Sequence, residues 1–253
     1  MDSLHAKLRD YRYVYNHKKS LIALVLATAG LISSPASFAT ETAAQPNLGA
    51  TLTQLTQQYP IHWISIEQVA ESLKGKAPIS VGFDIDDTLL FSSPAFFYGK
   101  QKFSPDSNAF LKNQKFWDEV SSSGWDRFSI PKDSGRALME LHLKRGDHVY
   151  FITGRPMPSN GKEDLTQTLK DDFKIPDNQL NKVIFAGTKQ DAKVEYMQKH
   201  HITIFYGDSD NDIQDARKAG AEGIRVLRPL NSTNKPMPKN GAFGEKVIVN
   251  SQY

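Results

Sequence analysis

Short apolar segments alternate with amphipathic segments along the chain after residue 60. The apolar segments are rich in Val, Ile and Phe, and they span residues 78–84, 148–154, 182–187, 202–208 and 223–227. The segments between them place apolar residues at helical spacing, over residues 133–146, 163–173, 188–200 and 211–220. Strands that alternate with helices predict an α/β fold, in which a parallel sheet is flanked by helices on both faces.

Residues 92–131 depart from this alternation. They follow the first of these strands and hold most of the conspicuous aromatic residues of the chain. We predict a small, mostly helical insertion that lies over the carboxyl ends of the strands, where ligands bind in such sheets. The aromatic residues of this insertion are either a local core or a platform for a substrate; they include Phe96, Phe97, Trp117 and Trp125.

The first 39 residues have the three-part pattern of a secretory signal peptide. The basic stretch NHKKS precedes the apolar run LIALVLATAGLI, and small residues follow at Ser37 and Ala39. We expect cleavage after Ala39, a poorly ordered arm over residues 40–59 and a periplasmic mature protein. The alternative is an uncleaved membrane anchor, but the apolar run is shorter than the roughly 20 residues that span a bilayer. The stretch before the lysines is long for a signal, which favours a start downstream of Met1.

Composition narrows the chemistry of the mature protein. The whole chain has a formal net charge of +3, and the basic residues of the leader account for that excess. The mature protein is therefore close to neutral, and we expect neither a nucleic-acid polymer as a partner nor a membrane contact after cleavage. The chain contains no cysteine, which excludes disulfides, zinc–thiolate sites and thiol nucleophiles.

Carboxylates gather where two of the predicted strands end. Asp84 and Asp86 follow the first strand, and Asp208 and Asp212 follow a later one. Buried carboxylates this close together need a cation between them to stay ionised. A hard divalent cation with oxygen ligands, preferably Mg²⁺, would supply it. A calcium loop of the EF-hand type that begins at Asp208 is the alternative, but it lacks the glycine and the glutamate that such a loop needs.

Other residues at the strand ends are suited to hold a phosphoryl group. Thr153 and Gly154 end the second strand, and Lys193 lies near the start of a predicted helix. A hydroxyl, backbone N–H groups and an ammonium can neutralise phosphate oxygens. One aspartate can then attack phosphorus while a second transfers protons. For Lys193 the alternative is a solvated surface charge, because Lys189 lies one turn earlier on the same predicted helix.

Four motifs, in order, resemble those of the haloacid-dehalogenase-like phosphohydrolases: FDIDDT with its D-x-D-x-T pattern, ITGR, the lysine of DAKVEYM, and GDSDND. Together with FSIPK, VIFAG and VIVNS, they make residues 60–253 resemble the class B nonspecific acid phosphatases. The resemblance implies a Rossmann-like fold and a periplasmic, Mg²⁺-dependent homotetramer. It also implies these roles: Asp84 as nucleophile; Asp86 as general acid/base; Asp84, the backbone oxygen of Asp86 and Asp208 as metal ligands; Thr153, Gly154 and Lys193 as phosphate ligands; and Asp212 outside the first ring of ligands, orienting water on the metal.

The activity implied by the resemblance is hydrolysis of small organic phosphomonoesters, such as nucleotides and aryl phosphates, through an aspartyl-phosphate. The same intermediate would also pass its phosphate to an alcohol acceptor. The alternative is an exported phosphate- or metal-binding protein without turnover. The presence of both Asp84 and Asp86 favours turnover, because proton transfer needs the second carboxylate and binding does not.

Overall fold

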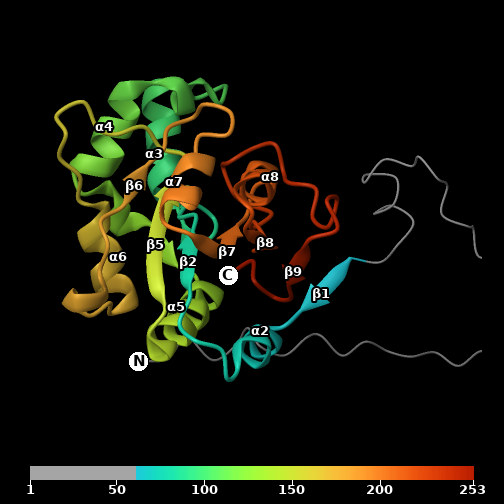
Figure 1. Cartoon of the computed structure of the whole chain (residues 1–253). Coiled ribbons are helices and arrows are strands. Elements are labelled where there is room, and N and C mark those ends of the chain that lie inside the picture. Colours follow the sequence, from blue (N-terminus) through green and yellow to red (C-terminus); the bar gives the residue numbers. More distant parts are fainter. Residues whose placement is uncertain (1–60) are drawn as a thin grey trace, which may run out of the picture. The chain divides into compact units, whose positions relative to one another are not determined.

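A seven-stranded parallel sheet organises residues 61–253, the part of the chain that the computed structural model describes (Figure 1). The strand order is β1-β9-β8-β7-β2-β5-β6, and every neighbouring pair is parallel. The predicted signal peptide and arm lie outside the described residues. The strands are β1 (His62–Ile64), β2 (Ser80–Phe83), β5 (His148–Thr153), β6 (Ile184–Phe185), β7 (Ile202–Gly207), β8 (Glu222–Arg225) and β9 (Lys246–Ile248).

Helices cover both faces of this sheet. One apolar core joins the sheet to α2 (Ile66–Leu73), α5 (Asp133–Arg145) and α6 (Leu165–Phe173), and a second core joins it to α7 (Val194–Lys199) and α8 (Asp210–Ala219). Successive side chains of a strand point to opposite faces, so Ile204 and Tyr206 of β7 belong to the first core and Phe205 belongs to the second. The predicted α/β fold with a helix-flanked parallel sheet is confirmed.

The predicted insertion forms a separate, small helical layer. It lies between β3 (Leu90–Phe91) and β4 (Ile130–Pro131), which pair antiparallel at its base. Its core is aromatic and includes Phe96, Phe116 and Trp117. Phe116 packs so closely on the helix that contains Gly99 that a Cβ at Gly99 would lie 2.2 Å from the Phe116 ring. The helices of the insertion are α3 (Ser93–Phe103), η1 (Ala109–Lys112), α4 (Gln114–Ser122) and η2 (Trp125–Phe128).

The sequence pattern misses two strands of the sheet, the short β3–β4 pair and α2, and it overextends one helix. β1 and β9 have three residues each, too few for an apolar period to show, and they extend the sheet beyond β8. The helix expected over residues 188–200 spans only Val194–Lys199. The backbone of Asp191 has a φ of 59°, in the left-handed region, and a right-handed helix cannot continue through it. Lys193 is therefore the residue that caps α7, and Lys189 does not lie on the helix.

Candidate active site

The predicted site residues meet at one edge of the sheet because β7, β2 and β5 are neighbours in it. Asp84 follows β2, Asp208 follows β7 and Gly154 follows β5. A cavity of about 270 Å³ opens at this edge, and all of the predicted site residues except Thr153 line it. The insertion contributes three apolar side chains to its wall: Phe96, Leu111 and Trp117.

Lys193 lies between two carboxylates. Its Nζ donates to Asp84 Oδ1 and to Asp212 Oδ1, each at 2.6 Å, and its side chain is only 10% exposed. Burial lowers the pKa of Lys193, but the charges of Asp212 and Asp84 outweigh burial and raise the pKa above its ordinary value. Lys193 is therefore a buried ammonium, and the alternative of a solvated surface charge is wrong.

Asp84, the predicted nucleophile, is buried where β2 ends. Its backbone N–H donates to Tyr206 O at 2.9 Å, and its Oδ2 accepts a hydrogen bond from Thr88 Oγ1 at 3.1 Å. Burial raises the pKa of Asp84 well above its ordinary value, although the charge of Lys193 opposes this shift. A further cation beside Asp84 would favour the ionised carboxylate.

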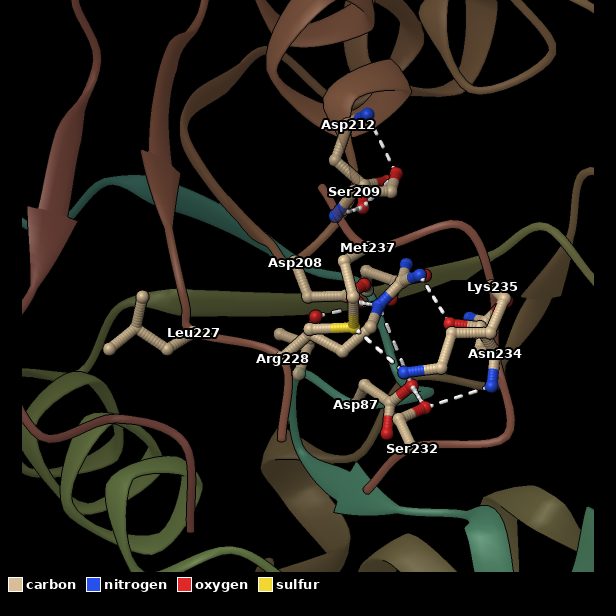
Figure 2. Close-up of polar contacts among 12 residues, drawn as sticks. Asp87, Asp208, Ser209, Asp212, Leu227, Arg228, Ser232, Asn234, Lys235 and Met237 are labelled. Carbon is tan, nitrogen blue, oxygen red and sulfur yellow. Dashed lines mark hydrogen bonds and ion pairs between the residues drawn. The ribbon is translucent and has the colours of Figure 1, made fainter. Parts of the chain in front are cut away.

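Arg228 holds Asp208 from the segment that follows β8 (Figure 2). Its Nε donates a short hydrogen bond to Asp208 Oδ2, and its Nη1 donates to the backbone oxygens of Asn234 and Pro236 at 2.8 and 2.9 Å. Burial raises the pKa of Asp208, and Arg228 opposes this shift. Asp208 thus has a fixed cationic partner that belongs to none of the four motifs.

Three buried carboxylates lie close enough together to share one cation. Asp84, Asp208 and Asp212 each place one oxygen within 4.8 Å of the other two, and we call these residues the carboxylate trio. An anionic donor set made only of oxygen suits a hard divalent cation. Asp212 comes this close because β7 ends in glycine: a Cβ at Gly207 would lie 2.3 Å from the Cβ of Asp212. The predicted ligand set placed Asp212 outside the first ring of ligands, and that position stays a prediction although its carboxylate lies within the trio.

The carboxylate of Asp86 pairs with Arg155 instead of joining the trio. Arg155 Nε donates to Asp86 Oδ2 at 2.8 Å, and Nη2 donates to Oδ1 at 2.7 Å. Ser92 Oγ also donates to Oδ1, at 2.5 Å. Burial raises the pKa of Asp86, but Arg155 and Ser92 outweigh burial and lower the pKa below its ordinary value. The side chain of Asp86 is thus held at the cavity wall by Arg155, which follows the neighbouring strand β5.

The residues after β7 do not form a calcium loop. α8 begins at Asp210, so the positions that would wrap around a calcium ion are helical. Ser209 caps this helix: its Oγ accepts a hydrogen bond from Asp212 N at 3.2 Å, and Asp212 Oδ2 accepts one from Ser209 N at 3.0 Å. The EF-hand alternative is therefore wrong.

Thr153 and Gly154 occupy different surroundings. Gly154 lines the cavity. Thr153 is buried, and its Oγ1 accepts a hydrogen bond from Arg155 N at 3.2 Å. That bond leaves the hydroxyl proton of Thr153 free to donate. The role of both residues in holding phosphate stays a prediction.

Comparison with known proteins agrees with the site. Residues 19–236 match the model of a family described as HAD superfamily, subfamily IIIB (Acid phosphatase). The chain belongs to this acid phosphatase family. The class B acid phosphatase of Edwardsiella ictaluri (strain 93-146) is 98% identical over 236 residues, which cover 93% of this chain and 98% of the relative. The class B acid phosphatase of Enterobacter sp. (strain 638) is 52% identical over 237 residues, which cover 92% of this chain and 99% of that relative.

Among solved structures, a phosphoserine phosphatase in its apo form matches this acid phosphatase with a TM-score of 0.44 and 18% identity, over 70% of this chain and 95% of that chain. Family membership makes the protein a hydrolase, so the predicted resemblance and enzyme class are confirmed. It leaves no support for an exported binding protein without turnover.

The site of this acid phosphatase also contains buried charged residues to which the sequence analysis assigned no role. Asp87 has a φ of 62° and is buried. Its Oδ2 accepts a hydrogen bond from Ser232 Oγ at 2.6 Å, and burial raises its pKa to about 7. Asp87 lies in FDIDDT, Arg155 in ITGR and Lys132 in FSIPK, so membership of these motifs was the available signal. These residues include Asp87, Asp126, Lys132, Arg155, Asp215 and Arg228.

Proposed function

We propose that this acid phosphatase hydrolyses small organic phosphomonoesters, such as nucleotides and aryl phosphates, with Mg²⁺ as its metal ion. The observation that carries the proposal is the buried ammonium of Lys193, 2.6 Å from Asp84 and beside the carboxylate trio. This arrangement joins a candidate nucleophile, a fixed positive charge and a cation site at one cavity. A cavity of about 270 Å³ suits a small ester.

Asp84 is the nucleophile of the proposed reaction. One of its carboxylate oxygens bonds to phosphorus while the bond from phosphorus to the ester oxygen breaks, which gives an aspartyl-phosphate. Asp86 gives its proton to the departing oxygen, and the alcohol leaves. Asp86 then takes a proton from water. The water oxygen bonds to phosphorus as the bond to Asp84 breaks, so phosphate leaves and both side chains regain their starting forms.

Acidic conditions favour the first step. Because Arg155 and Ser92 lower the pKa of Asp86, its carboxyl group carries a proton only toward lower pH. The nucleophile must stay ionised, but burial raises the pKa of Asp84. The ammonium of Lys193 opposes this shift, and a cation bound at the trio would oppose it further. A mildly acidic optimum therefore follows from the roles of the two carboxylates, with the bound cation keeping Asp84 ionised.

The remaining groups would hold the phosphoryl oxygens. Mg²⁺ bound by Asp84 and Asp208, with either the backbone oxygen of Asp86 or the carboxylate of Asp212 as a further ligand, would neutralise charge on the phosphoryl group. Lys193 would add a second positive charge. The backbone N–H of Gly154 and the hydroxyl of Thr153 would donate to the oxygens that face β5.

Transfer of phosphate to an alcohol is part of the same proposal. The aromatic rings of Phe96 and Trp117 in the cavity wall offer a surface on which a nucleoside acceptor could stack. A bound acceptor would then replace water in the second step. Product analysis with excess nucleoside separates the two outcomes, because transfer yields a new phosphomonoester and hydrolysis yields inorganic phosphate.

We further propose a periplasmic homotetramer that is released from the membrane by signal cleavage. The N-terminal pattern of residues 1–39 supports export. Within residues 61–253, no helix combines the length and the hydropathy that a membrane span requires. Cell fractionation and light scattering of the mature protein test the location and the number of subunits.

Chelation and one substitution test the proposed chemistry. Hydrolysis of 4-nitrophenyl phosphate should stop in EDTA and return with Mg²⁺, and Asp84→Asn should abolish both turnover and the phosphoryl adduct seen by intact mass after acid quench. Asp171→Asn, which changes an exposed carboxylate on α6, is the matched control and should keep full activity. Full activity in EDTA would contradict the metal requirement, and an adduct on Asp84→Asn would contradict the nucleophile.

A further inference from the structure

Arg155 is a buried cation whose hydrogen-bonding capacity is fully used. A guanidinium has five N–H groups, and five hydrogen bonds join this one to side chains. Nε and Nη2 donate to the two oxygens of Asp86. Nη1 and Nη2 donate to Asp126 Oδ2 and Oδ1 at 2.8 and 2.9 Å, and Nη1 also donates to Ser121 Oγ at 3.1 Å. Two carboxylates therefore share one guanidinium.

All side-chain partners of this guanidinium except Asp86 belong to the insertion. Ser121 lies in α4 and Asp126 in η2. The rings of Phe96 and Trp117 lie with their centroids 5.3 and 5.8 Å from Arg155 Cζ, where cation–π attraction is favourable. Arg155 itself follows β5 of the sheet. The guanidinium thus connects the insertion to the sheet beside the proposed acid/base.

Among the residues that the structure describes, Arg155 is the one hydrogen-bond partner of the Asp126 carboxylate. That carboxylate is fully buried, and both hydrogen bonds that it accepts come from Arg155. A buried ion pair is a weak source of stability, because desolvation of both charges offsets their attraction. The pair is better suited to fixing an orientation. What it orients is the Nε and Nη2 edge of the guanidinium, which faces Asp86.

We propose that Asp126 is a positioning residue for the proton transfer of this phosphatase. It fixes the plane of Arg155, and Arg155 holds Asp86 at the cavity wall. The proposal rests on the proposed function, because it requires Asp86 to be the acid/base. Without the charge of Asp126, the Nη1 edge of Arg155 loses its anionic partner, and the guanidinium can turn away from its paired geometry with Asp86. Misplacing a catalytic group by about 1 Å can cost about 100-fold in rate.

A double-mutant cycle tests this proposal. Steady-state kinetics are measured at saturating Mg²⁺ for the wild type, Asp126→Asn, Asp86→Asn and the double variant, each with an alkyl phosphate and with 4-nitrophenyl phosphate. We expect Asp126→Asn to lower kcat about tenfold or more for the alkyl phosphate, with KM within about twofold. The loss should be smaller for 4-nitrophenyl phosphate, whose leaving group hardly needs a proton. In the Asp86→Asn background, the same substitution should change kcat by less than about twofold.

Three further variants separate positioning from structural damage. Asp164→Asn is the matched control: Asp164 Oδ2 accepts a hydrogen bond from Gly124 N of the insertion at 2.6 Å, without contacting Arg155. This variant should keep the wild-type ratio of kcat for the two substrates. Asp126→Glu retains the charge and should recover part of the lost rate. Ser121→Ala should also lose more kcat with the alkyl phosphate than with 4-nitrophenyl phosphate, but the loss should be smaller than in Asp126→Asn. This variant provides the test if Asp126→Asn does not fold.

Two outcomes would overturn the positioning role alone. One is an equal loss of kcat for both substrates, and the other is an undiminished loss in the Asp86→Asn background. If Asp86→Asn itself lost equal activity on both substrates, the acid/base assignment would fail and the positioning role would fail with it. The three results can be told apart within the same set of measurements.

Discussion

Replacing Arg228 with methionine would show how far the carboxylate trio depends on a cation that the protein itself supplies. Arg228 is buried, and its Nε donates to Asp208 Oδ2, as Figure 2 shows. Methionine keeps an unbranched apolar stem but removes the charge and all five donors. In metal-free protein, the Asp208 carboxylate would then remain buried without its ion-pair partner, since Arg225 donates only to the backbone oxygen of Asp208. We therefore expect a large loss of stability that is specific to the metal-free state.

The size of this loss follows from the contacts of Arg228. Removing one partner of a buried ion pair costs about 3–5 kcal/mol. Asp208 would recover part of this cost by taking up a proton, since burial already raises its pKa, so we expect the lower end, about 3 kcal/mol. For a protein of this size, 1 kcal/mol corresponds to about 2–4 °C in Tm, which gives a fall of about 6–12 °C.

Thermal unfolding in EDTA and in excess Mg²⁺ measures the effect. Mg²⁺ would give Asp208 the cation that Arg228→Met removes, so it should raise the Tm of the variant more than that of the wild type. Arg217→Met is the control: Arg217 is an exposed arginine of α8 that donates to the backbone oxygen of Phe243, and its loss should change stability by no more than about 0.5 kcal/mol. An Arg228→Met protein that melts within about 2 °C of the wild type in EDTA would refute the reasoning.

His142 and Gly207 give two further predictions. Burial lowers the pKa of His142 below its ordinary value of 6.5, and its Nδ1 and Nε2 lie 2.7 Å from Asp147 Oδ2 and 3.0 Å from Tyr206 Oη. The imidazole therefore binds a proton more readily in the unfolded state, so the free energy of unfolding should fall as pH drops below about 6.5, by up to about 1.4 kcal/mol per pH unit. Urea unfolding of His142→Gln should show a smaller fall with pH than the wild type. An equal fall in the two proteins would show that His142 is not its origin. Gly207→Ala would place a Cβ 2.3 Å from the Cβ of Asp212 and so displace its carboxylate. The Mg²⁺ concentration needed for half-maximal activity should therefore rise. An unchanged Mg²⁺ titration would argue against Asp212 as part of the ion site.

The sheet and the meeting of its aspartates were predictable because both follow from local pattern. Apolar segments that end in aspartate or glycine indicate strands whose carboxyl ends share one edge, and this places Asp84 and Asp208 together before the strand order is known. β1 and β9 were missed because segments of three residues carry too little period. The helix at residues 188–200 was overextended because apolar spacing does not reveal the positive φ of Asp191.

The cationic partners of these aspartates were harder to predict than the aspartates themselves. Arg155 lies 69 residues from Asp86, and Arg228 lies 20 residues from Asp208. No period or spacing links such pairs, since each depends on how separate loops pack at the edge of the sheet. Asp126 is harder still, because its partner belongs to another layer of the structure and lies 29 residues away.

The cost of burying a carboxylate explains why the aspartates could be predicted and their cationic partners could not. A buried carboxylate requires a compensating charge, and this requirement follows from Asp84 and Asp208 alone. It does not say whether a metal ion or a side chain supplies the charge. In the structure the protein supplies much of it: Lys193 to Asp84 and Arg228 to Asp208. A metal ion at the trio therefore adds to charges that are already in place, so its removal should affect catalysis more than it affects the fold of the wild-type protein.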